Sequence, residues 1–131
     1  MNEKELRIGN YVNLIAEGHE KEPDTFKWDL EDYEFYYDRM DFIKPIPLTE
    51  EWLLKFGFER IFENSNLFLN ITNDIYFFLY NDKLKGCVRN HHTSYDNQLS
   101  ELEFELNIEF IHQLQNLYFC LTNKELELCG I

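Results

Sequence analysis

The sequence predicts an α+β fold in which two helices pack on a mainly antiparallel sheet. Two segments carry helical signals, near residues 49–56 and 108–122, and most strand candidates lie between them. The length of 131 residues fits one domain and leaves little room for two. Hydrophobic residues make up 44% of the chain, which is enough material for a packed core. We therefore expect a single compact acidic domain over residues 1–131.

The two helices are indicated by different signals. In the first, Thr49 is a good N-cap, Leu48 and Leu53 can form a hydrophobic staple, and Gly57 favours a left-handed end. In the second, apolar residues recur at three- and four-residue spacing, and Asn107 is the expected cap. Seven side chains of these helices are expected to be largely buried, namely Trp52, Leu53, Phe56, Ile111, Leu114, Tyr118 and Leu121.

The strand signals are clearest in two places. The apolar run 75–80 is followed by turn residues, so residues 84–89 are expected to return antiparallel to it. Residues 101–106 alternate strictly, which predicts that the apolar Leu102, Phe104 and Leu106 face a core and the glutamates face outward. We also expect a bent strand or short hairpin over 6–16, strands at 58–62, 67–72 and 125–128, and loops at 17–25 and 90–100.

The segment 26–42 has an unusual composition, because six carboxylates interleave with seven aromatic rings. Neither a period of two nor one of 3.6 accounts for all of it. One interpretation is a solvated acidic edge with its aromatics turned into the core. The other is an interaction surface, in which rings supply contact area and carboxylates complement Lys and Arg of a partner. The candidate partner-binding residues are Asp29, Glu31, Asp32, Tyr33, Glu34, Tyr36, Tyr37 and Asp38, together with Glu101, Glu103 and Glu105.

The net charge of −13 bounds the class of partner. A chain this acidic repels nucleic acids and anionic membranes, so we expect neither direct nucleic-acid binding nor membrane binding. A basic protein surface is its electrostatic complement. Same-face strand residues lie about 6.6–7 Å apart, close to the spacing of single-strand phosphates, so the glutamate row is a candidate nucleic-acid mimic. Ordinary strand amphipathicity is the alternative explanation of that row.

No catalytic motif is present, and we expect a non-enzymatic protein without metal or other cofactor. The metal-like cluster of His91, His92 and Asp96 is interpreted as a solvated loop, because adjacent strand residues point to opposite faces. We expect His112 to be a polar residue of a helix surface or interface, and Cys120 to be a small buried core residue. The three cysteines have no CxxC spacing, so we expect reduced thiols. The start lacks the apolar stretch of a signal peptide, which favours the cytoplasm.

Three segments of the chain are distinctive as a set: LRIGNYV at 6–12, PIPLTEEWLLKFGFE at 45–59 and HQLQNLYFCLT at 112–122 with ELEL shortly after. Together they resemble a family of small uncharacterised proteins encoded in bacteriophages and prophage regions of bacterial genomes. The resemblance implies a phage setting, in the cytoplasm of an infected bacterium, and it carries over no site residues.

Charge, composition and this resemblance together suggest a function. We expect an inhibitor, anti-CRISPR-like or anti-restriction, that engages a basic nucleic-acid-binding host protein or ribonucleoprotein such as an RNA-guided CRISPR nuclease. One alternative is a phage structural or adaptor module that acts through homo-oligomeric contacts. The other is a small nuclease using carboxylates and a divalent ion.

Overall fold

The computed structural model describes residues 1–15, 24–60, 66–89 and 101–129, and it confirms the α+β class. All strand pairs within its sheets are antiparallel, and the strands divide between two sheets. The three-stranded sheet has the order β2 (Asp24–Lys27), β1 (Tyr11–Leu14) and β3 (Ile43–Lys44). The four-stranded sheet has the order β4 (Phe68–Asn70), β5 (Ile75–Tyr80), β6 (Lys83–Arg89) and β7 (Glu101–Glu105).

Three α-helices accompany the sheets: α1 (Leu30–Phe35), α2 (Glu50–Lys55) and α3 (Ile111–Thr122). The sequence predicted α2, and the Thr49 hydroxyl caps it by accepting from the Trp52 backbone nitrogen at 3.3 Å. It did not predict α1. The start of α3 was placed too early. The N-cap of α3 is Phe110, whose backbone is extended, so Asn107 does not cap the helix. Just before it, the Leu48 nitrogen donates to the Glu109 carbonyl.

The hairpin of β5 and β6 confirms the predicted antiparallel return. Its strands are in register from Ile75 opposite Val88 to Tyr80 opposite Lys83. The turn is Asn81-Asp82, and both residues have positive φ, 50° and 61°. This two-residue turn has the left-handed geometry that matches the twist of the strands.

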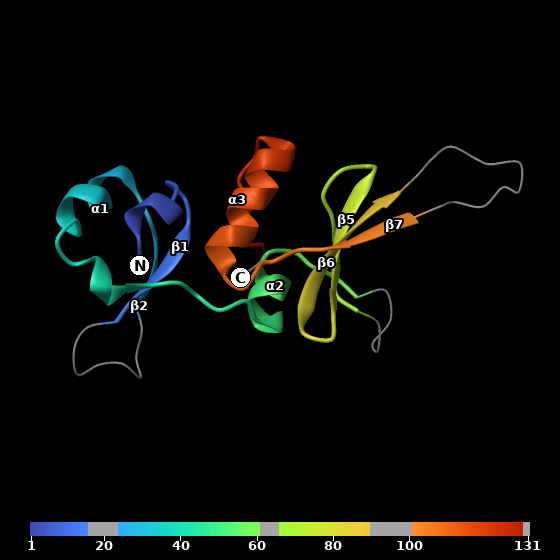
Figure 1. The fold of residues 1–131 in the computed structure, drawn as a ribbon, viewed down its shortest axis with the longest axis horizontal. Coiled ribbons are helices and arrows are strands. Elements are labelled where there is room, and N and C mark those ends of the chain that lie inside the picture. Colours follow the sequence, from blue (N-terminus) through green and yellow to red (C-terminus); the bar gives the residue numbers. More distant parts are fainter. Residues whose placement is uncertain (16–23, 61–65, 90–100, 130–131) are drawn as a thin grey trace, which may run out of the picture.

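The described residues form two separate hydrophobic cores, and α3 lies between the two sheets (Figure 1). The large core packs between the four-stranded sheet, α2 and α3. Its buried members are Ile46, Leu53, Phe56, Phe58, Leu67, Ile71, Phe77, Leu84, Ile111, Leu114 and Leu126. The small core belongs to the three-stranded sheet and contains Leu6, Val12, Trp28, Met40 and Ile43.

Most of the expected burial is confirmed, with corrections at the end of α3. Leu53, Phe56, Ile111 and Leu114 are buried, whereas Trp52 and Tyr118 are partly buried against the large core. Leu121 is 40% exposed, and Cys120 is exposed as well, so both predictions of burial were wrong. The last turn of α3 therefore extends past the core.

The segment 125–128 forms no strand, which corrects a further expectation. It nevertheless returns towards α2, because the Cys129 backbone nitrogen donates to the Lys55 carbonyl at 2.6 Å. Leu126 is buried in the large core. The alternation of this segment therefore reflects one buried side and not a sheet partner.

Candidate interaction surfaces

The segment 26–42, in which carboxylates interleave with aromatic rings, contains the end of β2, the helix α1 and a turn that follows it. Two of its carboxylates stabilise the start of α1. The Asp29 side chain accepts from the Leu30 backbone nitrogen at 2.7 Å. The Asp32 side chain accepts in turn from the Asp29 backbone nitrogen at 2.8 Å. The Asp29 side chain also accepts from the Asp32 backbone nitrogen, so the two residues form a capping box, which satisfies donors that a helix start leaves free. Asp29 and Asp32 thus have a structural role.

Two of the candidate tyrosines, Tyr33 and Tyr36, also have a structural role. The Tyr33 hydroxyl donates to the Leu6 carbonyl at 2.7 Å, and its ring meets Trp28 edge-on at 5.3 Å between centroids. The Tyr36 ring lies 5.9 Å from both Trp28 and Phe26. Both tyrosines are therefore partly buried against the small core.

The rest of the segment is open to solvent. Leu30, Phe35 and Tyr37 are 67%, 61% and 76% exposed. Glu31, Glu34 and Asp38 are exposed too. Tyr33 and Tyr36, three residues apart, take the inner face, as helical spacing allows. Leu30 lies three residues before Tyr33 but is exposed at the first position of the helix. We define the α1 surface as Leu30, Glu31, Glu34, Phe35, Tyr37 and Asp38.

A small hollow adjoins the α1 surface at the helix cap. It has a volume of about 300 Å³ and is lined by Ile8, Gly9, Lys27, Trp28 and Asp29. Ile8, like Leu30, is a large apolar side chain left exposed. The hollow therefore adds a concave, partly apolar feature beside the protruding residues of α1.

The predicted glutamate row on β7 has Glu103 and Glu105 exposed on one face, and the side chain of Glu101 lies outside the described atoms. Cations of the neighbouring strand accompany the row, because Lys85 lies opposite Glu105 and Arg89 opposite Glu101. Alternating cations make this face a mixed surface, which is unlike the uniform charge of a phosphate backbone.

The apolar side of β7 differs from the prediction. Leu102 is 69% exposed and Phe104 is 37% exposed, so they do not face a core as expected. Leu106, just after the strand, does pack against the large core. The strand therefore starts beyond the core and reaches it only at its end.

The two sets of candidate residues do not form one site. The α1 surface lies on the part of the fold that is built around the small core. The strand β7 is an edge of the four-stranded sheet, on the other side of α3 (Figure 1). A partner that contacts both would have to span α3. Each set must therefore be considered as a separate surface.

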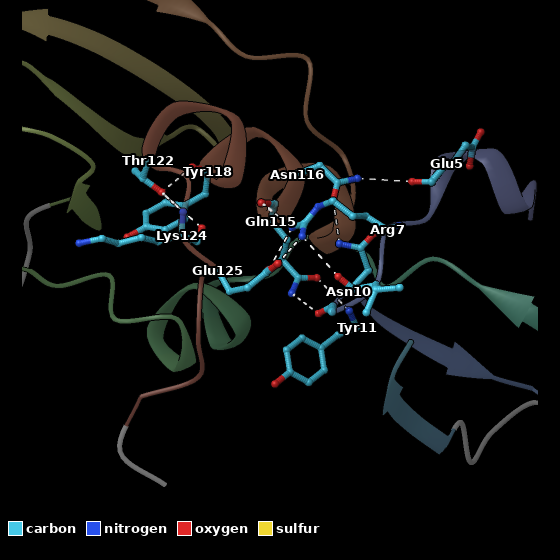
Figure 2. Close-up of polar contacts among 12 residues, drawn as sticks. Glu5, Arg7, Asn10, Tyr11, Gln115, Asn116, Tyr118, Thr122, Lys124 and Glu125 are labelled. Atoms are coloured by element: carbon cyan, nitrogen blue, oxygen red, sulfur yellow. Dashed lines mark hydrogen bonds and ion pairs between the residues drawn. The ribbon is translucent and has the colours of Figure 1, made fainter. Parts of the chain in front are cut away.

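A polar network that the sequence did not indicate joins the three-stranded sheet to α3 (Figure 2). The Arg7 guanidinium makes two hydrogen bonds with the Glu125 carboxylate and donates through Nε to Asn116 Oδ1 at 3.1 Å. It also lies 4.3 Å over the Phe119 ring. Asn10 Nδ2 donates to the same Asn116 oxygen at 2.8 Å.

Gln115 completes the network from the buried side of α3. Its Nε2 donates to the Gly9 carbonyl at 3.0 Å, and its Oε1 accepts from the Tyr11 backbone nitrogen at 2.8 Å. These groups are paired with one another, so the network is best explained as the connection between the two parts of the fold. The only signal in the sequence was a pair of amides, Gln115 and Asn116, inside an apolar helix pattern.

His112 is 2% exposed, so of the two expected places, a helix surface or an interface, the helix surface is wrong. Its ring stacks on Phe110 at 5.9 Å between centroids, and Nδ1 has no hydrogen-bond partner. Burial lowers the pKa of this imidazole, and the nearby Glu5 carboxylate partly opposes the shift. Burial therefore favours the neutral form of this imidazole.

Within residues 1–15, 24–60, 66–89 and 101–129, no group of three His, Cys, Asp or Glu side chains is placed to hold a metal ion. His91, His92 and Asp96 lie outside these ranges. Cys87 is buried, Cys120 and Cys129 are exposed, and all three are free thiols. In the part of the chain that the structure describes, no helix is long and apolar enough to cross a membrane.

Comparison with known proteins gives no relative: no protein-family model, curated protein or solved structure matches the chain.

Proposed function

We propose that this chain is a non-enzymatic binding protein that docks a basic partner protein through the α1 surface. The observation that carries the proposal is the exposure of Leu30, Phe35 and Tyr37 among carboxylates. Exposed aromatic and aliphatic side chains are the usual anchors of protein interfaces. Carboxylates around them steer a partner that carries Lys and Arg.

The way α1 is held supports the proposal. Asp29 and Asp32 fix its start, and Tyr33 and Tyr36 attach it to the small core. The exposed side chains are therefore presented on backbone that is already ordered. Binding then requires little further ordering of the chain, which favours affinity.

The class of partner follows from charge. A net charge of −13 favours a basic protein, and proteins that handle nucleic acid carry such surfaces. In the phage setting that the resemblance suggests, the concrete form of the proposal is an inhibitor of an RNA-guided or restriction nuclease. This chain would bind the protein or ribonucleoprotein and not the nucleic acid itself.

The test is affinity capture from a bacterial lysate with three baits, at low and high salt. They are the unmodified chain, an α1 variant with Glu31, Glu34 and Asp38 changed to Lys, and a control with Glu59, Glu109 and Glu127 changed to Lys. All six positions are exposed, and the two variants have the same net charge. Asp29 and Asp32 stay unchanged because they cap α1. Thermal melting confirms that each bait is folded.

We expect the unmodified chain and the control to capture the same basic protein and the α1 variant to lose it. With that protein purified, the association rate should fall as salt rises, because exposed charges are screened beyond about 10 Å at 0.1 M salt. Phe35→Ala with Tyr37→Ala should shorten the lifetime of the complex while leaving the association rate nearly unchanged.

Three results would contradict the proposal. Equal loss with both charge variants would show that only net charge matters. Capture that survives in the α1 variant would place the interface elsewhere. Light scattering that shows an oligomer whose assembly requires the α1 surface would favour the alternative function, a structural or adaptor module.

A further inference from the structure

The strand β7 is an edge of the four-stranded sheet, and no described residue pairs with its outer side. The Leu106 nitrogen donates to the Leu84 carbonyl at 3.3 Å, which shows that backbone groups of Leu106 point towards β6. Along an antiparallel strand, the backbone N–H and C=O groups of successive residues point alternately to one side and to the other. The backbone N–H and C=O groups of Glu103 and Glu105 therefore point outward, free to pair with another strand.

The two faces of this open edge differ in chemistry. One face carries Glu103 and Glu105, which are exposed and make no ion pair with any described residue. The other carries the exposed Leu102 and Phe104. A strand added at the outer edge would meet carboxylates on one side and apolar groups on the other.

The inner neighbour β6 is a strand that fits the same requirements. It reads KLKGCVR, in which Lys83, Lys85 and Arg89 are on one side and apolar or small residues on the other. Cys87 interrupts the cations on the first side, opposite Glu103. Lys85 lies opposite Glu105 and Arg89 opposite Glu101, while Val88 lies opposite Leu102. Gly86 leaves room for the Phe104 ring, since an added Cβ would come within 2.4 Å of it. The chain thus already pairs β7 with an alternating basic and apolar strand.

A second copy of β7 does not fit the outer edge. Antiparallel self-pairing centred on Glu103 would set this residue opposite its own copy and Glu101 opposite Glu105. Like charges directly opposite each other destabilise a strand pair. The glutamates therefore protect the edge from self-association, which is how natural edge strands are commonly blocked.

We propose that the outer edge of β7 binds an extended segment of a partner protein in which Lys or Arg alternates with apolar residues. Binding occurs by strand addition, in which backbone hydrogen bonds give affinity and alternate side chains give specificity. This surface is distinct from the α1 surface and does not depend on the function proposed there.

The test uses the complete chain and an end-blocked fluorescent peptide, KLKVTVR, which repeats the alternation of β6. The control peptide KKLVVRT has the same composition without the alternation. Fluorescence anisotropy measures binding. We expect the alternating peptide to bind about tenfold more tightly, because only it can place cations and apolar groups on opposite faces.

Two pairs of variants separate backbone pairing from charge. Glu103→Gln and Glu103→Pro both remove the carboxylate, but only proline removes the outward N–H, at a position where an edge strand tolerates it. Glu103→Lys with Glu105→Lys is matched by Glu31→Lys with Glu34→Lys, which changes the net charge equally. We expect Glu103→Pro to bind about tenfold more weakly than Glu103→Gln. The β7 charge reversal should weaken binding about tenfold and the α1 reversal less than about threefold.

The inference is overturned if both peptides bind equally, if Glu103→Pro binds as Glu103→Gln does, or if the two charge reversals act equally. Absence of saturable binding up to about 1 mM peptide overturns it as well. If sedimentation shows a dimer that Glu103→Pro abolishes, the occupant of the β7 edge is a second copy of the chain and not a basic segment of a partner. If melting shows that Glu103→Pro unfolds, peptides N-methylated on alternate backbone nitrogens replace it. One of the two methylation registers must then lose binding.

Discussion

Replacing Gln115 by methionine tests whether the polar network holds the two parts of the fold together. Gln115 is 1% exposed, and its amide satisfies the Gly9 carbonyl and the Tyr11 nitrogen. Methionine has a similar volume but cannot replace either hydrogen bond, so the cavity contribution is small. Each buried group left without a partner costs about 1–3 kcal/mol. With two such groups, we expect the free energy of unfolding to fall by about 2–6 kcal/mol, a large part of the about 5–15 kcal/mol of a typical domain.

Urea unfolding followed by circular dichroism measures this change, with Gln113→Met as the matched control. Gln113 accepts from the Glu109 and Phe110 backbone nitrogens at 2.8 and 3.1 Å, at the start of the same helix, and its side chain is only partly buried. Water can replace these bonds, so we expect a loss of about 1 kcal/mol or less. A loss for Gln115→Met no larger than that of the control would refute the structural role of the network.

Three further outcomes are expected. Burial lowers the pKa of His112, so its contribution to stability is present above the unfolded value of 6.5 and is lost as pH falls through the folded pKa. Urea midpoints measured from pH 8 to pH 5 should therefore fall less in His112→Leu than in the unmodified chain. Asp82→Gly should raise the free energy of unfolding by about 0.5–1 kcal/mol, because φ of 61° suits glycine, and an unchanged or lower midpoint would contradict this. Thiol titration without reductant should show two rapidly reacting cysteines in the native protein, Cys120 and Cys129, and a third after unfolding, Cys87; a smaller final count would reveal a disulfide.

The elements that were predicted correctly are those whose structure is determined by residues close together in the sequence. The cap of α2 and the turn between β5 and β6 each depend on a few neighbouring residues. The helix α1 was missed because its six residues combine inward Tyr33 with outward Leu30 and Phe35, and no single apolar face results. The last turn of α3 repeats the apolar spacing of the first turns, yet no core lies beside it. Periodicity shows which side a residue takes, but not how far the core extends.

The candidate site was predicted in part for the same reason. Composition identified the segment 26–42 as unusual, and four exposed residues of the α1 surface were named, namely Glu31, Glu34, Tyr37 and Asp38. The exposed Leu30 and Phe35 were not named. Which carboxylates cap a helix and which are free depends on where α1 begins, at Asp29. Whether Leu102 faces a core depends on the position of β7 relative to α3, which only long-range pairing defines. The division of strands between two sheets has the same origin.

The network around Gln115 also has a consequence for the order in which the chain is made. Gly9 and Gln115 are 106 residues apart. At a synthesis rate of about 5–20 residues per second, about 5–20 s pass between them. Throughout this time the chain lacks the amide that pairs with Gly9 and Tyr11. The polar network between the three-stranded sheet and α3 can therefore be complete only after translation has passed Glu125.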